Sequence, residues 1–283
     1  MEFELLRAAF AIAGCAALSY FDIFNRRNVP DRLLQAFLAV SFLLCVISFS
    51  IEIIAYSLAV ALIAGLAGFF AYKMGQVGGA DVYAIVSLSL LLPQKPGLFG
   101  QDASFLSLPP IFTILFYSIL IFCIYIMLST FPAVFRAIRK GEIAIPPIRM
   151  LEAGALAILY AVFILSASQF LSPAYLLSFS IIFLFAVFFL LFGQFLKKSF
   201  ISFLPAKKIE EEDVLALEFM EKEIVKKYSL PSLVGSRELY LLKKLPLKQF
   251  AVYSKMPFFL PFLLLGLILS LFFGELFLLP FAW

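Results

Sequence analysis

Long apolar runs follow one another through most of this chain, and they limit its fold more than any other feature. A helix of about 20 apolar residues spans the hydrocarbon core of a bilayer. Of the 283 residues, 64% are hydrophobic and 14% are charged, which is more apolar surface than a soluble domain needs. The apolar residues do not alternate with polar ones, as they would in a membrane β-barrel. The sequence therefore predicts an all-α polytopic membrane protein.

Eight candidate transmembrane helices can be placed along the chain, and six is the lower limit. The fourth is short for a bilayer, so either its first residues lie slightly inside the membrane or residues 93–109 complete the crossing irregularly. The first follows acidic residues and not basic ones, so we expect a permanent span and not a cleaved signal peptide. The predicted spans are residues 3–21, 33–51, 53–72, 80–92, 110–131, 151–171, 174–196 and 257–273.

Charged residues concentrate late in the chain, which divides it into three predicted parts. Residues 1–198 form a transmembrane core, residues 199–256 a small cytoplasmic subdomain, and residues 257–283 the last transmembrane helix and a tail. Within the subdomain we expect an amphipathic helix in KKIEEEDVLALEFMEKEIVKKYSL and a short strand at ELYLLKK. A segment of this size is only marginally stable by itself.

Basic residues in the connections predict the orientation, because Lys and Arg concentrate on the cytoplasmic side. In an eight-span arrangement with the N-terminus outside, four connections share that side, and the opposite connections carry little that is basic beyond Lys95. The sequence thus predicts a multi-pass plasma-membrane protein surrounded by lipid. The cytoplasmic connections hold Arg26, Arg27 and Arg32, then Lys73, then Arg136, Arg139, Lys140 and Arg149, then Lys197 and Lys198.

The chain contains no histidine, and its three cysteines are isolated in apolar runs. Catalytic triads of the Ser-His and Cys-His kinds are therefore excluded, and neither a zinc site nor a disulfide framework is indicated. We expect no metal or other cofactor and no nucleic-acid partner, and the sequence does not define an oligomeric state. Hydrolytic chemistry here must rest on carboxylates, on lysine or on a carboxylate-bound metal.

Two aspartates lie at the ends of spans that are predicted to meet the cytoplasmic face. Asp22 ends the first span and Asp81 begins the fourth. Each has an ordinary explanation by itself, since Asp22 can pair with Arg26 one turn later and Asp81 can be a helix N-cap. The strongest competing carboxylates on this face are Glu142 and Glu152. Carboxylates near hydrocarbon are costly, so two at one face indicate a site.

The sequence before Asp81, GQVGGA, supports this interpretation because a plain span end does not need so many glycines. Glycines let a backbone approach closely, either from a neighbouring helix or from an extended peptide. Two carboxylates at one site share a proton, so one can take a proton from water while the other donates to a peptide carbonyl. We expect Asp81 as the base and Asp22 as the acid. The expected substrate loop consists of Gly75, Gly78, Gly79 and Ala80.

Three stretches resemble the type IV prepilin peptidases, in particular the archaeal prepilin and preflagellin (archaellin) peptidases of the GxGD aspartyl protease class. SYFDIFNRRNVPD is similar to the first aspartate motif, GGADVYAI to the second, and KMPFFLPFLLLGLILSLFFG to the last span. The resemblance implies that Asp22 and Asp81 are catalytic. It also implies that the protein cuts a short basic leader from a prepilin-like or preflagellin-like membrane protein at the cytoplasmic face.

Some residues depart from the family pattern. Ala80 replaces the second glycine of GxGD, which alanine satisfies only where the backbone avoids positive φ. Tyr83 stands where lysine is frequent, and Asn28 lengthens the spacing from Asp22 to Pro30 by one residue. The cysteine-rich zinc insert of the bacterial enzymes is absent, so their N-methyltransferase activity is not implied.

Two other functions remain open from the sequence. A presenilin-like or signal-peptide-peptidase-like protease also uses paired aspartates, but its Pro-Ala-Leu motif is not supplied convincingly here. A proton- or cation-coupled transporter would place its carboxylates near the midplane and would show repeated halves.

The acidic run at residues 210–213 likewise has two interpretations. It either attracts a basic leader, or it is an exposed helix end whose glutamates pair with nearby lysines. For the second, favoured interpretation the expected pairs lie among Glu218, Glu223, Lys222 and Lys226.

Overall fold

Helices make up most of the computed structural model, which describes residues 2–25, 28–94, 109–143, 145–171, 173–245, 249–254 and 256–274. Six helices are long and apolar enough to cross a membrane, and α4 and α10 are shorter apolar helices. The predicted polytopic helical membrane protein is therefore confirmed. The apolar helices are α1 (Glu2–Phe24), α2 (Asp31–Ser48), α3 (Ile51–Lys73), α4 (Gly79–Leu91), α5 (Pro110–Arg139), α6 (Pro147–Ala167), α7 (Pro173–Phe200) and α10 (Leu260–Phe273).

Prolines mark where several of these helices begin. Pro110 and Pro147 occupy the first turns of α5 and α6, and Pro30 immediately precedes α2. Proline suits the start of a helix because its fixed φ is already helical and its missing N–H would have no partner within the helix. Some predicted features fall on residues 95–108 and 275–283 or on Arg26 and Arg27, and these lie outside the described residues.

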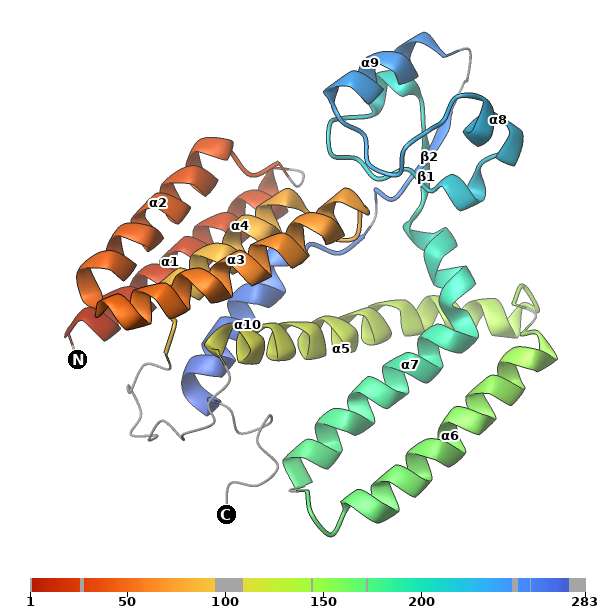
Figure 1. The fold of residues 1–283 in the computed structure, drawn as a ribbon. Coiled ribbons are helices and arrows are strands. Elements are labelled where there is room, and N and C mark those ends of the chain that lie inside the picture. The colour runs from red at the N-terminus through yellow and green to blue at the C-terminus, as the bar shows by residue number, and fades with distance from the viewer. Residues whose placement is uncertain are drawn as a thin grey trace.

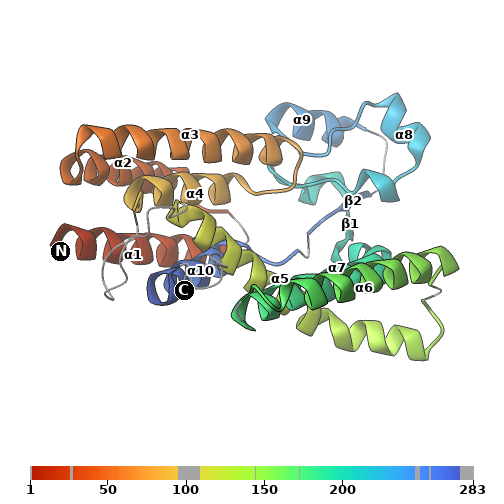
Figure 2. The same ribbon diagram turned by 60° about the horizontal axis from the view of Figure 1, so that its bottom comes forward.

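The first four helices lie side by side, and α10 packs against both α1 and α5 (Figures 1 and 2). The short helix α4 contacts α1, α2, α3 and α5, so it lies at the centre of this group. One apolar cluster joins α1, α2, α4, α5 and α10, and it includes Leu18, Phe37, Leu88, Ile114 and Leu263. This packing fixes the two helices that carry the aspartates.

A glycine allows α10 to approach α5 closely. A Cβ atom on Gly266 would overlap the side chain of Ser118 and would lie 2.6 Å from the carbonyl oxygen of Ile114. Helices in a membrane gain little from apolar burial, so close backbone contact of this kind contributes much of their association. By contrast, α6 packs against α7 and buries none of its described residues. The apolar surface of α6 is therefore available to lipid.

A small subdomain connects α7 to α10 and lies at one end of the helices (Figure 1). Its two strands, β1 (Ser202–Leu204) and β2 (Phe250–Val252), pair in antiparallel register with Ser202 opposite Val252. The segment entering the subdomain is thus hydrogen-bonded to the segment that leaves it. Between the strands lie the 3-10 turns η1 (Ala206–Lys208) and η2 (Leu217–Phe219) and the helices α8 (Lys222–Lys227) and α9 (Ser236–Lys244).

One prediction within the subdomain is wrong. The segment ELYLLKK forms helix α9 and not a strand, because Leu239 and Leu242, three positions apart, both pack into the apolar cluster of the subdomain. The expected amphipathic helix is reduced to the six residues of α8. Glu211 and Glu212 of the acidic run lie in a turn, and after them Val214 pairs with Leu233 and Leu215 pairs with Val252. The fold is consequently helical with one small sheet.

Candidate active site

Asp22 lies in the last turn of α1, and it is buried although its side chain carries a carboxyl group. Only 7% of the residue is exposed. The residue belongs to a helix whose inner face joins the main apolar cluster through Cys15 and Leu18. Burial of a carboxylate at the end of a membrane helix is costly unless the site supplies partners, so its placement favours a functional role over an ordinary helix end.

Asp81 is the third residue of α4 and not its N-cap, which corrects the simple capping interpretation. Gly78 is the N-cap, and its N–H donates a hydrogen bond of 3.1 Å to Oδ2 of Asp81. A carboxylate at this third position can reach back to the cap residue, and the absence of a side chain on Gly78 leaves space for it. The hydrogen bond ties the carboxylate to the loop that precedes the helix.

The structure brings the two aspartates together. The carboxylates of Asp22 and Asp81 are close enough to interact electrostatically, and their helices α1 and α4 are in contact. The competing carboxylates have other neighbours: Glu142 lies 3.8 Å from Lys140, and Glu152 lies 3.1 Å from Arg149. Of the acidic residues considered from the sequence, Asp22 and Asp81 therefore make the strongest candidate pair.

The glycine loop between α3 and α4 is a tight turn. Gly75 has φ of 71°, and its N–H donates to the carbonyl of Tyr72, so it ends α3 in the left-handed conformation that glycine favours. Gly79 and Ala80 already belong to α4. Because Ala80 is helical and has no positive φ, alanine satisfies this position, as the sequence required.

The loop also contacts the subdomain, which the sequence did not predict. The hydroxyl of Tyr72 donates a hydrogen bond of 2.9 Å to Oε1 of Glu212. Glu212 belongs to the acidic run, so one of its carboxylates has a partner in α3 and is not simply an exposed helix end. The two residues are 140 positions apart, and no local pattern in the sequence indicates that they meet.

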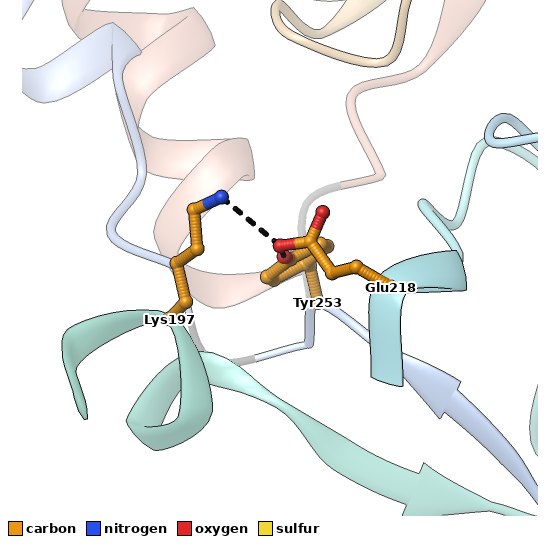
Figure 3. A network of polar contacts seen from close by, with 3 residues as sticks. All are labelled: Lys197, Glu218 and Tyr253. Atoms are coloured by element: carbon orange, nitrogen blue, oxygen red, sulfur yellow. Dashed lines mark hydrogen bonds and ion pairs between the residues drawn. The ribbon is translucent and has the colours of Figure 1, made fainter. Parts of the chain in front are cut away.

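A second polar contact ties the subdomain to α7 (Figure 3). Oε1 of Glu218 accepts hydrogen bonds from Lys197 at 3.0 Å and from the hydroxyl of Tyr253 at 2.8 Å. The bonds from Tyr253 and Lys197 lower the pKa of Glu218, and burial together with the carboxylate raises the pKa of Tyr253. The expected pairing of Glu218 with a lysine of its own segment is wrong, because Lys197 of α7 takes that place.

No group of three or more His, Cys, Asp or Glu side chains within the described ranges is arranged to hold a metal ion. A hollow lies between α5 and α7, away from the aspartates. It is lined by Ala133, Arg136, Ala137, Lys140, Glu142 and Phe195.

One known protein family is similar to the part of the chain that holds the two aspartates. Residues 9–127 match the type IV leader peptidase family. The matched part runs from α1 into α5, so it contains both aspartates and the glycine loop, but it is less than half of the chain. None of the curated proteins and none of the solved structures compared with the chain matches it.

The matched segment is similar to the type IV leader peptidases, which are aspartic peptidases that cleave prepilin leaders. The predicted peptidase activity is confirmed at this level. The match favours it over the presenilin-like protease and the transporter that the sequence left open.

Proposed function

We propose that Asp22 and Asp81 are the catalytic pair with which this protein cleaves prepilin-type leaders. The observation that supports the proposal most strongly is the electrostatic interaction between the two carboxylates, inside the segment that matches the peptidase family. Like charges at one site do not both ionise readily, so the pair shares a proton. One member is then a base and the other an acid.

The reaction needs only this pair and water. The ionised carboxylate takes a proton from water, whose oxygen attacks the carbonyl carbon of the peptide bond. The protonated carboxyl group gives its proton to the carbonyl oxygen. When the tetrahedral intermediate collapses, the C–N bond breaks and the proton taken from water passes to the leaving nitrogen. One hydroxyl group of the intermediate returns its proton to the other carboxylate as the carbonyl forms again. Asp81 as the first base and Asp22 as the first acid stays a prediction, because a coupled pair titrates as a unit.

The proposed substrates are prepilin-like or preflagellin-like membrane proteins with a short basic leader before an apolar helix. Gly78 faces the site, since a Cβ atom there would lie 3.1 Å from Oδ2 of Asp81. An extended backbone can approach such a position closely. Gly75, Gly79 and Ala80 shape the same loop, which we propose borders the substrate.

We further propose that the site faces the cytoplasm. Asp22 lies in the last turn of α1 and Asp81 in the first turn of α4, next to the end of α3 where Tyr72 contacts Glu212 of the subdomain. The last turns of α3 and α7 carry Lys73, Lys197 and Lys198. Basic residues favour the cytoplasmic side of a membrane, which supports this orientation in the plasma membrane.

Sealed membrane vesicles test function and orientation together. A purified prepilin-like substrate with its basic leader is added to vesicles of each orientation, and loss of the leader is read by gel mobility and mass. We expect cleavage when the cytoplasmic face is outward, and in right-side-out vesicles only after detergent opens them. Cleavage by intact right-side-out vesicles would contradict the orientation. Absence of cleavage in detergent, with several leaders, would contradict the function.

A further inference from the structure

The subdomain touches the glycine loop and the end of α3 through one short stretch, residues 212–214. Oε1 of Glu212 accepts the hydrogen bond from Tyr72 and would lie 3.3 Å from a Cβ atom on Gly79. A Cβ atom on Gly75 would lie 3.1 Å from Cγ1 of Val214. Tyr72 near the end of α3, together with Gly75 and Gly79, therefore lies against the same piece of the subdomain.

That piece is held firmly on its other side. The N–H of Glu212 donates to the carbonyl of Val234 at 2.8 Å, and the N–H of Val234 donates to the carbonyl of Asp213 at 3.0 Å. The N–H of Tyr253 donates to the carbonyl of Val214 at 2.9 Å. Because Val234 is fully buried in the apolar cluster of the subdomain, residues 212–214 form a fixed surface against which the loop rests.

Glu212 also has an unusual backbone conformation. Its φ is 68°, and Ser229 is the other non-glycine residue with positive φ in the described parts of the chain. Such a conformation costs free energy for a residue with a side chain, and strained positions of this kind often lie at functional contacts. With this backbone, the carboxylate reaches Tyr72.

We propose that Tyr72 and Glu212 are positioning residues that fix the glycine loop and, through it, the carboxylate of Asp81. The loop is coupled to the carboxylate because the N–H of Gly78 donates a hydrogen bond to Asp81. A catalytic group must be held close to its productive geometry, so a freer loop slows the chemical step without preventing substrate binding. The inference rests on the proposed catalytic role of the aspartate pair.

Three substitutions separate positioning from other roles. E212G removes the carboxylate and suits the positive φ, so it adds no backbone strain. Y72F removes the hydroxyl, and E212Q keeps an oxygen that can accept the hydrogen bond. We expect E212G and Y72F each to lower kcat for leader cleavage about threefold to tenfold, the range of one modest hydrogen bond. KM should stay within about twofold of the native value. The double variant of E212G and Y72F should lose no more kcat than either single variant. E212Q should keep kcat close to the native value.

The Glu218–Tyr253 contact supplies the matched control. Y253F removes a tyrosine hydroxyl bonded to a glutamate at 2.8 Å, but that contact lies on the α7 side and not at the glycine loop. We expect Y253F to leave kcat within about twofold, since it removes one similar bond elsewhere. Amide hydrogen exchange of residues 74–79 should be faster in E212G and Y72F and unchanged in Y253F.

Unchanged kcat and unchanged loop exchange in E212G would overturn the positioning role while the proposed catalytic pair stands. A rise in KM that is equal in E212Q and E212G would also overturn it, because the charge of Glu212 would then bind the leader. If the native protein cleaves no leader, the proposed function is contradicted. Faster exchange of residues 74–79 in E212G would then still support the coupling of loop and subdomain.

Discussion

At the scale of single residues, the glycine loop shows how the site depends on backbone conformation. Gly75 combines a φ of 71° with a close contact to Val214. Gly78 has no side chain, and so the carboxylate of Asp81 can reach its N–H. Neither property depends on the chemistry of a functional group, although both determine where the carboxylate lies.

Replacement of Gly75 by alanine tests this dependence. We expect G75A to lose about 1–2 kcal/mol of stability from the left-handed conformation, and to lose leader cleavage as its Cβ atom displaces Val214. G141A is the matched control, because Gly141 has φ of 70° and no atom within 4 Å of the added carbon. Thermal unfolding in detergent and cleavage rates measure the two effects. Equal cleavage in both variants would show that the contact with Val214 is irrelevant.

At the scale of the helices, the close approach of α10 to α5 carries much of the packing around the site. Since Gly266 lies against Ser118 and Ile114, we expect G266A to destabilise the protein by about 1–3 kcal/mol, as overpacking does. Gly154 in α6 has nothing within 4 Å of an added carbon. G154A should therefore be neutral or slightly stabilising. Thermal unfolding in detergent measures the stability of the two variants. Equal stability of G266A and G154A would contradict the close contact.

The junction between α7 and the subdomain should depend on pH. Hydrogen bonds from Tyr253 and Lys197 lower the pKa of Glu218. The stabilisation of the junction by these bonds is therefore fully present above the ordinary glutamate pKa. It is lost as the pH falls through the lowered value, when the carboxylate takes up a proton. We expect proteolysis between α7 and η2 to accelerate over that acidic range.

The control for this prediction is E218Q, which cannot ionise. Its proteolysis between pH 6 and about 3 should lack the step that the native protein shows. An identical step in both proteins would mean that another group controls the junction.

At the scale of the whole molecule, the apolar runs were enough to predict the apolar helices, and the basic connections led to the prediction that Asp22 and Asp81 share one face. The sequence could not predict the contact of Tyr72 with Glu212, because residues 140 positions apart meet only through tertiary structure. It also misassigned α9, since a seven-residue window does not separate a strand from a helix when its leucines fit both periods. The N-cap was misplaced because Gly78 has no side chain to signal that role.

The central claim is that two aspartates from distant parts of the chain act as one catalytic unit. The most direct measurement is the rate of leader cleavage by D22N, D81N and the double variant, each in the intact protein. We expect each single substitution to reduce the rate by about 10³-fold or more and the double variant to lose no more than either, because the residues act together. Substantial cleavage by either single variant, or independent losses that multiply in the double variant, would contradict the claim.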